Sequence, residues 1–149
     1  MSLFNIFQVS SQGMTAQRAR LEAAASNLAN AHTTRTAEGG PYRRRDVVFE
    51  TVPVDEASGN VFAAADTAAG AKPLGVRATT VAAATAEGLK SYQPGHPDAD
   101  AGGYVTLPDV DPLEETVNML SAARSFEANA TALQTAKEML RTSLKLGEA

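Results

Sequence analysis

Large apolar residues recur at seven-residue intervals along the first thirty positions of the chain. Phe7, Met14, Leu21 and Leu28 form this series, and alanines fill many of the positions between them. One large residue per heptad on a background of strong helix formers is typical of an α-helix with a narrow apolar side. The pattern predicts a helix near residues 2–30, about 45 Å long at a rise of 1.5 Å per residue.

A second helix is predicted to begin at Asp111. Asp111 is a good N-cap residue, Pro112 suits the first helical position, and Glu114 completes a capping box of the form Asp-x-x-Glu. Lys145 lies near the predicted end, where a cation complements the helix dipole, and Gly147 is a plausible stop.

The second helix carries a seam of apolar residues that alternate by four and three. Its positions are Met119, Ala123, Phe126, Ala130, Leu133, Lys137, Leu140 and Leu144, with Ala136 able to substitute for the lysine. Leu113, Val117 and Leu120 extend the pattern backward as a shifted stripe. Such spacing predicts that this helix packs lengthwise against another helix.

The segment between the two helices reads as β-rich and partly extended. Gly39-Gly40-Pro41 predicts a turn before a strand over residues 46–52. Further short strands are predicted at 61–62, 74–81 and 104–107, and an extended crossing at 92–97. The Ala-, Thr- and Gly-rich stretches 63–71 and 78–88 are left without an assignment.

These patterns predict an α+β chain in three parts. They are an N-terminal helical part at residues 1–33, a middle region at 34–110 with a low-complexity stretch near 63–88, and a C-terminal helix at 111–149 that pairs with 1–33 as a coiled coil. The chain has 29 alanines and no tryptophan, and only 5% of its residues are aromatic. Because alanine lets helices approach closely but fills little volume, we expect long, thin packing rather than a deep pocket.

Charge and cysteine content narrow the function. A net charge of −4 argues against a nucleic-acid binder, and Arg43-Arg44-Arg45 reads as a solvated or subunit-facing strand start rather than a site for an anionic polymer. The absence of cysteine excludes disulfides, thiolate metal sites and cysteine nucleophiles.

No membrane or secretion segment is predicted. No lysine or arginine precedes the apolar residues of positions 1–9, and Asn5 and Gln8 interrupt them, so we expect no cleaved signal peptide. The chain also lacks a run of about 18 predominantly large apolar residues, so we expect no membrane span.

Candidate chemistry is sparse. His96, Asp98 and Asp100 alternate along a turn-rich segment, but no further ligand is nearby and the two aspartates more simply begin turns, so we expect no metal. His32 has no Ser or Asp pattern around it that would make a triad. With no phosphate-binding glycine loop either, we expect no enzyme, no cofactor and no small-molecule substrate.

Two motifs stand out in place of a catalytic pattern: Ser26-Asn27-Leu28-Ala29-Asn30 at the end of the first helix, and Arg124-Ser125-Phe126-Glu127-Ala128-Asn129 inside the second. The two asparagines of the first motif either satisfy backbone groups at the helix end or hydrogen-bond between subunits. Arg124 is either a solvated guanidinium or one member of an ion pair with a neighbouring subunit.

These motifs resemble the bacterial flagellar basal-body rod protein family, in its proximal-rod type. The resemblance continues through Pro41-Tyr42-Arg43 and through residues 92–110, and it covers residues 1–53 and 92–149. Many rod and hook proteins follow the first motif with Thr-Pro-Gly, whereas this chain has a longer segment from Thr33 to Gly40. Residues 54–91 resemble no family segment.

The resemblance implies a structural subunit of the rod, exported through the flagellar export apparatus and assembled with copies of itself and with other rod proteins. It implies packing between subunits for the motif and seam residues, which are Phe7, Met14, Leu21, Asn27, Leu28, Asn30, Arg124, Phe126, Asn129, Leu133, Leu140 and Leu144. Two alternatives stay open at this point: another rod- or hook-type axial subunit, and a cytosolic coiled-coil adaptor.

Overall fold

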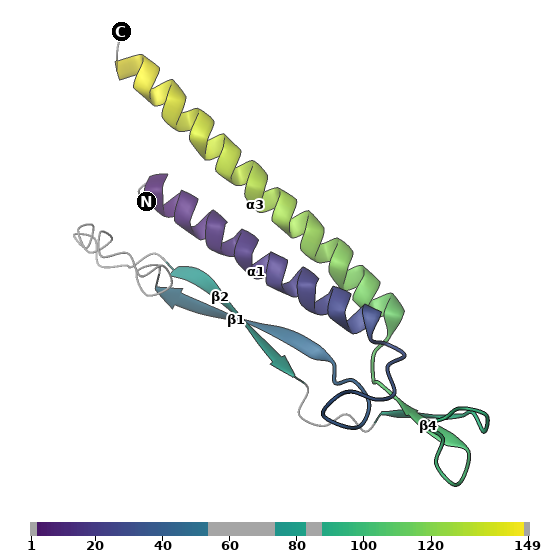
Figure 1. Ribbon diagram of the computed structural model, residues 1–149. Helices are drawn as coiled ribbons and strands as arrows, with labels where there is room; N and C mark the ends of the chain where they lie inside the picture. The colour runs from purple at the N-terminus through teal and green to yellow at the C-terminus, as the bar shows by residue number, and fades with distance from the viewer. Residues whose placement is uncertain (1–2, 54–73, 83–87, 148–149) are drawn as a thin grey trace. The chain divides into compact units, whose positions relative to one another are not determined.

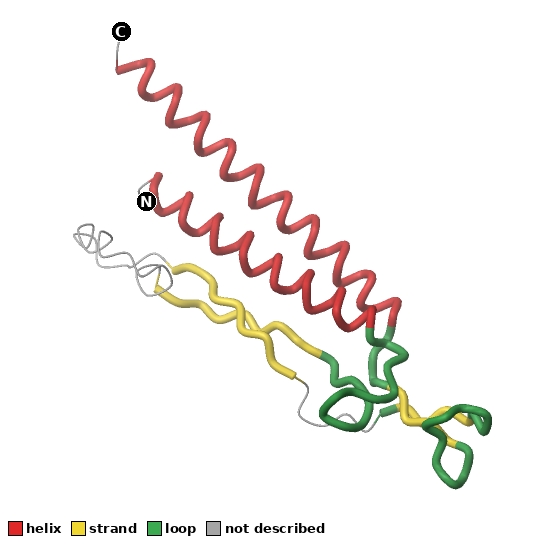
Figure 2. The backbone as a smooth tube through the Cα atoms, in the orientation of Figure 1, coloured by secondary structure: helices red, strands yellow, loops and turns green. Residues whose placement is uncertain are grey.

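The computed structural model describes residues 3–53, 74–82 and 88–147 of the chain (Figure 1). In chain order its elements are α1 (Leu3–Ala29), β1 (Arg45–Pro53), β2 (Leu74–Ala82), β3 (Leu89–Tyr92), β4 (Tyr104–Leu107) and α3 (Pro112–Gly147). Two long helices near the chain ends and short strands between them make this an α+β fold (Figure 2).

Both predicted helices are confirmed, and polar side chains mark where they end and begin. At the end of α1 the Asn30 side chain donates to the carbonyl of Ser26 at 2.9 Å. At the start of α3 the Leu113 amide donates to Asp111 Oδ1 at 2.8 Å, as an N-cap requires. The reciprocal half of the predicted capping box is not formed, because the Glu114 carboxylate accepts from Arg44 instead.

The predicted strands at 46–52, 74–81 and 104–107 are confirmed as β1, β2 and β4. β1 and β2 form one two-stranded sheet, and β3 and β4 form another. The strand predicted at 61–62 and the stretch 63–71 lie outside the described residues, as do positions 83–87.

The extended crossing predicted at 92–97 is wrong, because this segment begins the hairpin loop of residues 93–103 between β3 and β4. β3 pairs antiparallel with β4, so that Tyr92 lies opposite Tyr104 and Leu89 opposite Leu107. The loop closes where the Gln93 amide donates to the Gly103 carbonyl at 2.8 Å. Gly103 has a φ of 81°, and a Cβ there would lie 3.0 Å from the Tyr92 ring, so only glycine fits.

The chain divides into two compact units. The first unit consists of Met1–Ala19, Val48–Thr79 and Ser121–Ala149, and the second of Arg20–Val47 and Thr80–Leu120. Each unit therefore contains a segment of both long helices, and the two segments lie side by side with opposite chain directions (Figure 1).

The interior of the first unit is made of small side chains. Ala16 on α1 and Ala122 and Ala136 on α3 are buried. Gly13 faces Asn129 of α3, and a Cβ on Gly13 would lie 3.0 Å from the Asn129 Nδ2 atom. Small residues at these positions allow the two helices of this unit to approach closely.

The second unit has a more polar interior. Ala23 and Ala24 of α1 are buried, and Ala31, Tyr42 and Val110 form a small apolar cluster. Asn27 and Glu115 are also buried, with side chains that require polar partners.

The shifted stripe of Leu113, Val117 and Leu120 is largely exposed within the single chain. These side chains are 72%, 58% and 57% exposed, whereas Glu115 and Ala122 of the same helix are buried. Alanine and one partnered carboxylate take the inward positions, so the larger residues of this helix end point outward.

No helix within the described residues is long and apolar enough to cross a membrane.

Candidate functional site

The end of α1 is tied to the start of β1 through Asn27, which is 1% exposed. Asn27 Nδ2 donates to the Arg45 carbonyl at 2.9 Å, and Asn27 Oδ1 accepts from the Arg45 amide at 2.8 Å. The Tyr42 hydroxyl donates to the same oxygen at 3.0 Å. One buried amide thus pairs with both backbone groups of a strand residue, as a neighbouring strand would.

The residues around Asn27 complete this hydrogen-bond network. The Ser26 and Tyr42 hydroxyl oxygens lie 3.1 Å apart, and because Tyr42 donates its proton to Asn27, Ser26 is the donor in this bond. Asn30 Oδ1 accepts from the Thr33 hydroxyl at 3.2 Å. Both asparagines of the motif therefore hydrogen-bond within their own chain, where they satisfy backbone groups.

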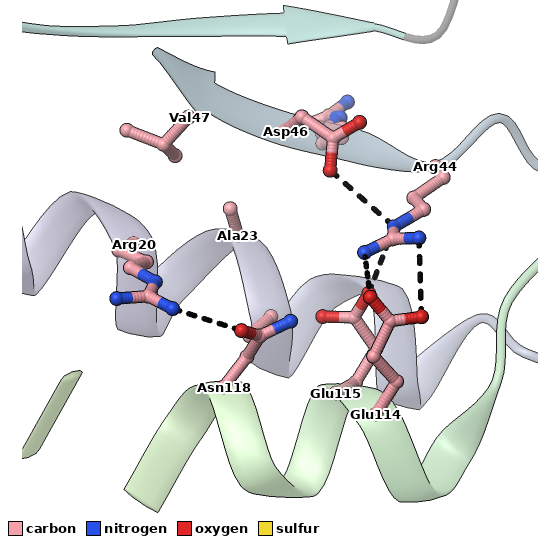
Figure 3. Close-up of a pocket in the computed structure, with 10 residues that line it drawn as sticks. Arg20, Ala23, Arg44, Asp46, Val47, Glu114, Glu115 and Asn118 are labelled. Atoms are coloured by element: carbon pink, nitrogen blue, oxygen red, sulfur yellow. Dashed lines mark hydrogen bonds and ion pairs between the residues drawn. The ribbon is translucent and has the colours of Figure 1, made fainter. Parts of the chain in front are cut away.

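Arg44 ties the same segment to the start of α3. Its guanidinium lies 3.1 Å from Glu114 Oε1, 3.0 Å from Glu115 Oε1 and 3.3 Å from Asp46 Oδ1 (Figure 3). The Arg44–Glu115 contact has the distance of an ion pair without the alignment of a hydrogen bond. Glu115 is only 2% exposed, so Arg44 is the charge that makes its burial tolerable.

The carboxylates also hold Arg44 in its charged form. Partial burial by itself lowers the pKa of Arg44, but the hydrogen bond to Glu114 and the charges of Glu115 and Asp46 outweigh it, so that this pKa is raised. Arg44 therefore stays positively charged beside Glu114, Glu115 and Asp46. We name Asn27, Tyr42, Arg44, Glu114 and Glu115 the clasp, because together they fix residues 42–45 to both helices of the second unit.

A small crevice is lined in part by Arg44, Glu114 and Glu115 of the clasp. The crevice has a volume of about 230 Å³, and its lining includes Ala23, Ala24 and Asn118; Ala23 and Asn118 are labelled in Figure 3. Arg20 on its rim donates to Asn118 Oδ1 at 2.9 Å. The volume lies below the usual range of about 300–1,000 Å³ for ligand pockets, and Arg44 in its wall is paired with Glu114 and Glu115.

The candidate metal ligands serve the hairpin loop instead. His96 Nδ1 accepts from the Asp98 amide at 3.1 Å, and Asp98 Oδ2 accepts from the Thr34 hydroxyl at 2.8 Å. Asp100 Oδ1 accepts from the amides of Gly102 and Tyr104 at 2.8 and 2.9 Å. The bond from Tyr104 is the main reason that the pKa of Asp100 is lowered. Across the described ranges, no three His, Cys, Asp or Glu side chains are grouped to hold a metal ion.

The residues predicted to pack between subunits differ in their exposure within the single chain. Asn27 is buried; Phe7, Met14, Leu21, Asn30, Asn129, Leu133 and Leu140 are half-buried; Leu28, Arg124, Phe126 and Leu144 are exposed. The structure unites Asn27 and Asn30 in one network and places Asn129 against Gly13. Their contacts with other subunits stay a prediction.

Sequence reasoning missed the clasp partners Tyr42, Arg44 and Glu115. Arg44 was interpreted as part of a solvated or subunit-facing run, yet its side chain is only 26% exposed and bridges to α3. A usable signal was present, because the Glu114-Glu115 pair at a helix start and the Arg43-Arg44-Arg45 run are opposite in charge. Pairing them required a long-range contact that local spacing does not give.

Comparison with known proteins extends the similarity along the whole chain. The family model "Flagella basal body rod protein" matches residues 7–35, and "Flagellar basal body rod FlgEFG protein C-terminal" matches residues 101–146.

Curated relatives named flagellar basal-body rod protein FlgC occur in distant bacteria. The relative from Escherichia coli O6:H1 is 41% identical over 99% of this chain and 100% of its own length. The relative from Salmonella typhimurium is 40% identical with the same coverage, and that from Bacillus subtilis is 37% identical over 99% of this chain and 100% of its own length. The chain therefore belongs to the flagellar basal-body rod protein family, in its FlgC type.

Proposed function

We propose that the chain is a structural subunit of the proximal rod of the bacterial flagellar basal body, and that it polymerises helically into the drive shaft that transmits motor torque. The observation that carries this proposal is the similarity to FlgC proteins over nearly the whole chain. The fold supports it, because helices near both chain ends leave large apolar side chains exposed for neighbours.

The assembly contacts belong to the same proposal. Residues 1–33 and 111–149 form the axial part and pair as a coiled coil, and residues 34–110 form the middle region. Seam residues on both helices, such as Met14 and Leu133, are half-buried within the chain, which supports this pairing. The part of each side chain that stays exposed is available to a neighbouring subunit. A head-to-tail interface that does not close on itself produces a helical assembly of this kind.

Partners and location follow from the rod role. The chain assembles with copies of itself and with other rod proteins, passes through the flagellar export apparatus without a cleaved signal peptide, and works where the rod crosses the periplasm. It performs no catalysis and binds no nucleic acid or small-molecule substrate. The small volume of the crevice in the second unit supports a purely structural role.

The two alternatives, another axial subunit and a cytosolic adaptor, are not favoured. The relatives match over their full length as well as over this chain, and they carry the FlgC name in bacteria as distant as Escherichia coli and Bacillus subtilis. An adaptor would be stably helical and oligomeric by itself.

The proposed function is tested by deleting the encoding gene in its source bacterium, complementing it, and imaging isolated basal bodies by electron microscopy. We expect membrane rings without a completed rod in the deletion strain, and complete rods after complementation. Intact rods and normal swimming in the deletion strain would overturn the proposal.

A point substitution tests the seam within this function. Leu133 is half-buried on α3, and Leu133→Asp places a charge in the seam without a partner, so we expect loss of rod assembly and of swimming. Gln134→Asp is the matched control, because Gln134 is exposed on the same helix and takes the same new charge. Normal swimming with Leu133→Asp would contradict this register.

A further inference from the structure

We propose that a strap of β-structure closes on α1 of the first unit through a latch, the side-chain amide of Gln12, and that this latch couples docking of the strap to ordering of the helix. The strap consists of residues 48–53 of β1 and 74–79 of β2, which belong to the first unit together with residues 1–19. Because the latch is a contact within one chain, this inference does not depend on the proposed function.

Gln12 of α1 binds the backbone of β2 at a close approach. Its Oε1 atom accepts a hydrogen bond from the Val76 amide at 3.2 Å. Gly75 is buried beside it, and a Cβ on Gly75 would overlap Gln12 Oε1 and lie 2.8 Å from Gln12 Cδ. The side-chain amide therefore rests directly against the Gly75 backbone, and a larger residue at this position would displace it.

The latch is only half satisfied. The Val76 amide is a donor, so the Gln12 oxygen must face it and Nε2 must point elsewhere. Gln12 Nε2 is buried and has no hydrogen-bond partner in the described part of the chain. A buried donor without a partner costs free energy that offsets part of the gain from the bond to Val76.

A second amide on the same helix shows what a fully satisfied contact looks like. Asn27 donates to the carbonyl of one strand residue, Arg45, and accepts from its amide at 2.9 and 2.8 Å. Gln12 makes one such bond to β2, and that bond is longer. Of the two contacts, the one at Gln12 is therefore the weaker and the one that opens first.

Few other contacts hold the strap. Val52 of β1 is 8% exposed, but the large apolar side chains of Val48, Phe49 and Leu74 are 47%, 40% and 63% exposed. Segments that bury few apolar side chains open locally at a low free energy. The contact of Gln12 with β2 thus contributes a large share of what keeps the strap on α1.

The latch links the strap and the helix in both directions. The helix fixes the direction in which the Gln12 side chain projects, so the amide is presented to β2 when α1 is formed. A docked strap in turn favours the helical form of α1, because the hydrogen bond to Val76 is made in that form. Such a coupling is reciprocal. A substitution confined to β2 should therefore change the stability of α1.

Hydrogen exchange in the associated protein, at a concentration where its helices are formed, tests the latch. We expect Gln12→Ala to raise the exchange rate of the Val76 amide about tenfold or more, because this amide loses its acceptor. Gly75→Ala should do the same, since the new Cβ displaces the Gln12 amide. Gly75→Ala should also raise exchange at the α1 amides of the first unit. Gly95→Ala is the matched control, because a Cβ there meets nothing within 4 Å.

A double variant separates the latch from a general loss of stability. The three atoms nearest to a Cβ on Gly75 all belong to Gln12, so Gly75→Ala should add little once Gln12→Ala is present. Gln17→Ala is the control for loss of a glutamine, since Gln17 is half-buried on the same helix and its Oε1 has no hydrogen-bond partner among the described residues. The Arg45 amide, held by Asn27, is the internal reference and should exchange as in the unsubstituted chain.

Three results would count against the proposal. Unchanged exchange at Val76 in Gln12→Ala would refute the latch. Equal increases at the Val76 and Arg45 amides would show general unfolding in place of a local opening. Faster exchange at Val76 in Gly75→Ala with unchanged exchange in α1 would refute the coupling between strap and helix.

Discussion

Single buried side chains hold the second unit together, and Asn27 is the clearest case. Its amide takes part in three hydrogen bonds, two with the Arg45 backbone and one with Tyr42. We expect Asn27→Ala to lower the free energy of unfolding by about 2–4 kcal/mol, because the partly buried Arg45 amide and carbonyl lose their partner. Urea unfolding of the associated protein, at a concentration where its helices are formed, measures the change by circular dichroism. Asn30→Ala is the control, and its loss should be smaller because Asn30 is only half-buried; equal losses would contradict the clasp.

Asp100 makes the hairpin loop sensitive to acid. Its pKa is lowered, chiefly by the hydrogen bond from the Tyr104 amide, so the folded loop favours the ionised carboxylate. The stabilisation is therefore fully present above the ordinary pKa of 3.8 and is lost as the pH falls through the lower folded value. We expect hydrogen exchange at the Gly102 and Tyr104 amides to lose protection across that window. Asp100→Asn should abolish this pH dependence, whereas Asp109→Asn, outside the hairpin, should retain it.

At the scale of elements, the close approach of α1 and α3 in the first unit depends on Gly13. A Cβ at this position already meets the Asn129 side chain, so Gly13→Val overpacks the contact and should cost about 1–3 kcal/mol of unfolding free energy. Thermal unfolding of the single and double variants in the associated state, where both helices are formed, tests this, because Asn129→Ala should relieve part of the loss. Ser11→Val is the control, since Ser11 is exposed on the same helix. Equal losses from Gly13→Val with and without Asn129→Ala would rule out this contact as the cause.

Elements with strong local signals were predictable from the sequence, and those that depend on distant partners were not. The apolar heptads before Asn30 predicted α1, and the Asp111-Pro112 helix start predicted α3. A run of β-branched residues predicted β1. β3 was missed because Leu89–Tyr92 is short and becomes a strand only through pairing with β4. The inward side of α3 near its start could not be predicted from an apolar pattern, because the buried Glu115 becomes tolerable only beside Arg44.

At the scale of the whole molecule, the distribution of large apolar residues favours assembly over stability in isolation. The buried helix positions are mostly alanines, such as Ala16 and Ala136, whereas Leu144 and Leu146 are 67% and 75% exposed. Burying a large apolar side chain contributes roughly 1.5–3 kcal/mol, so the exposed ones become stabilising only when a neighbouring subunit covers them. Ordering a helical residue costs about 1.5 kcal/mol before its contacts are counted. The two helices contain 27 and 36 residues, and the contacts between their small side chains recover little of this cost.

We therefore expect α1 and α3 to be poorly ordered in the isolated monomer and to fold fully on assembly. Circular dichroism of a dilute sample, shown to be monomeric by analytical ultracentrifugation, should give less helix than the two helices of the structure contain. Helix content should rise as the concentration is raised and the chain associates. The physical reason is that alanine-lined helices pack closely but bury little volume, so they depend on association for their order. A verified monomer with a full helical signal would contradict this expectation.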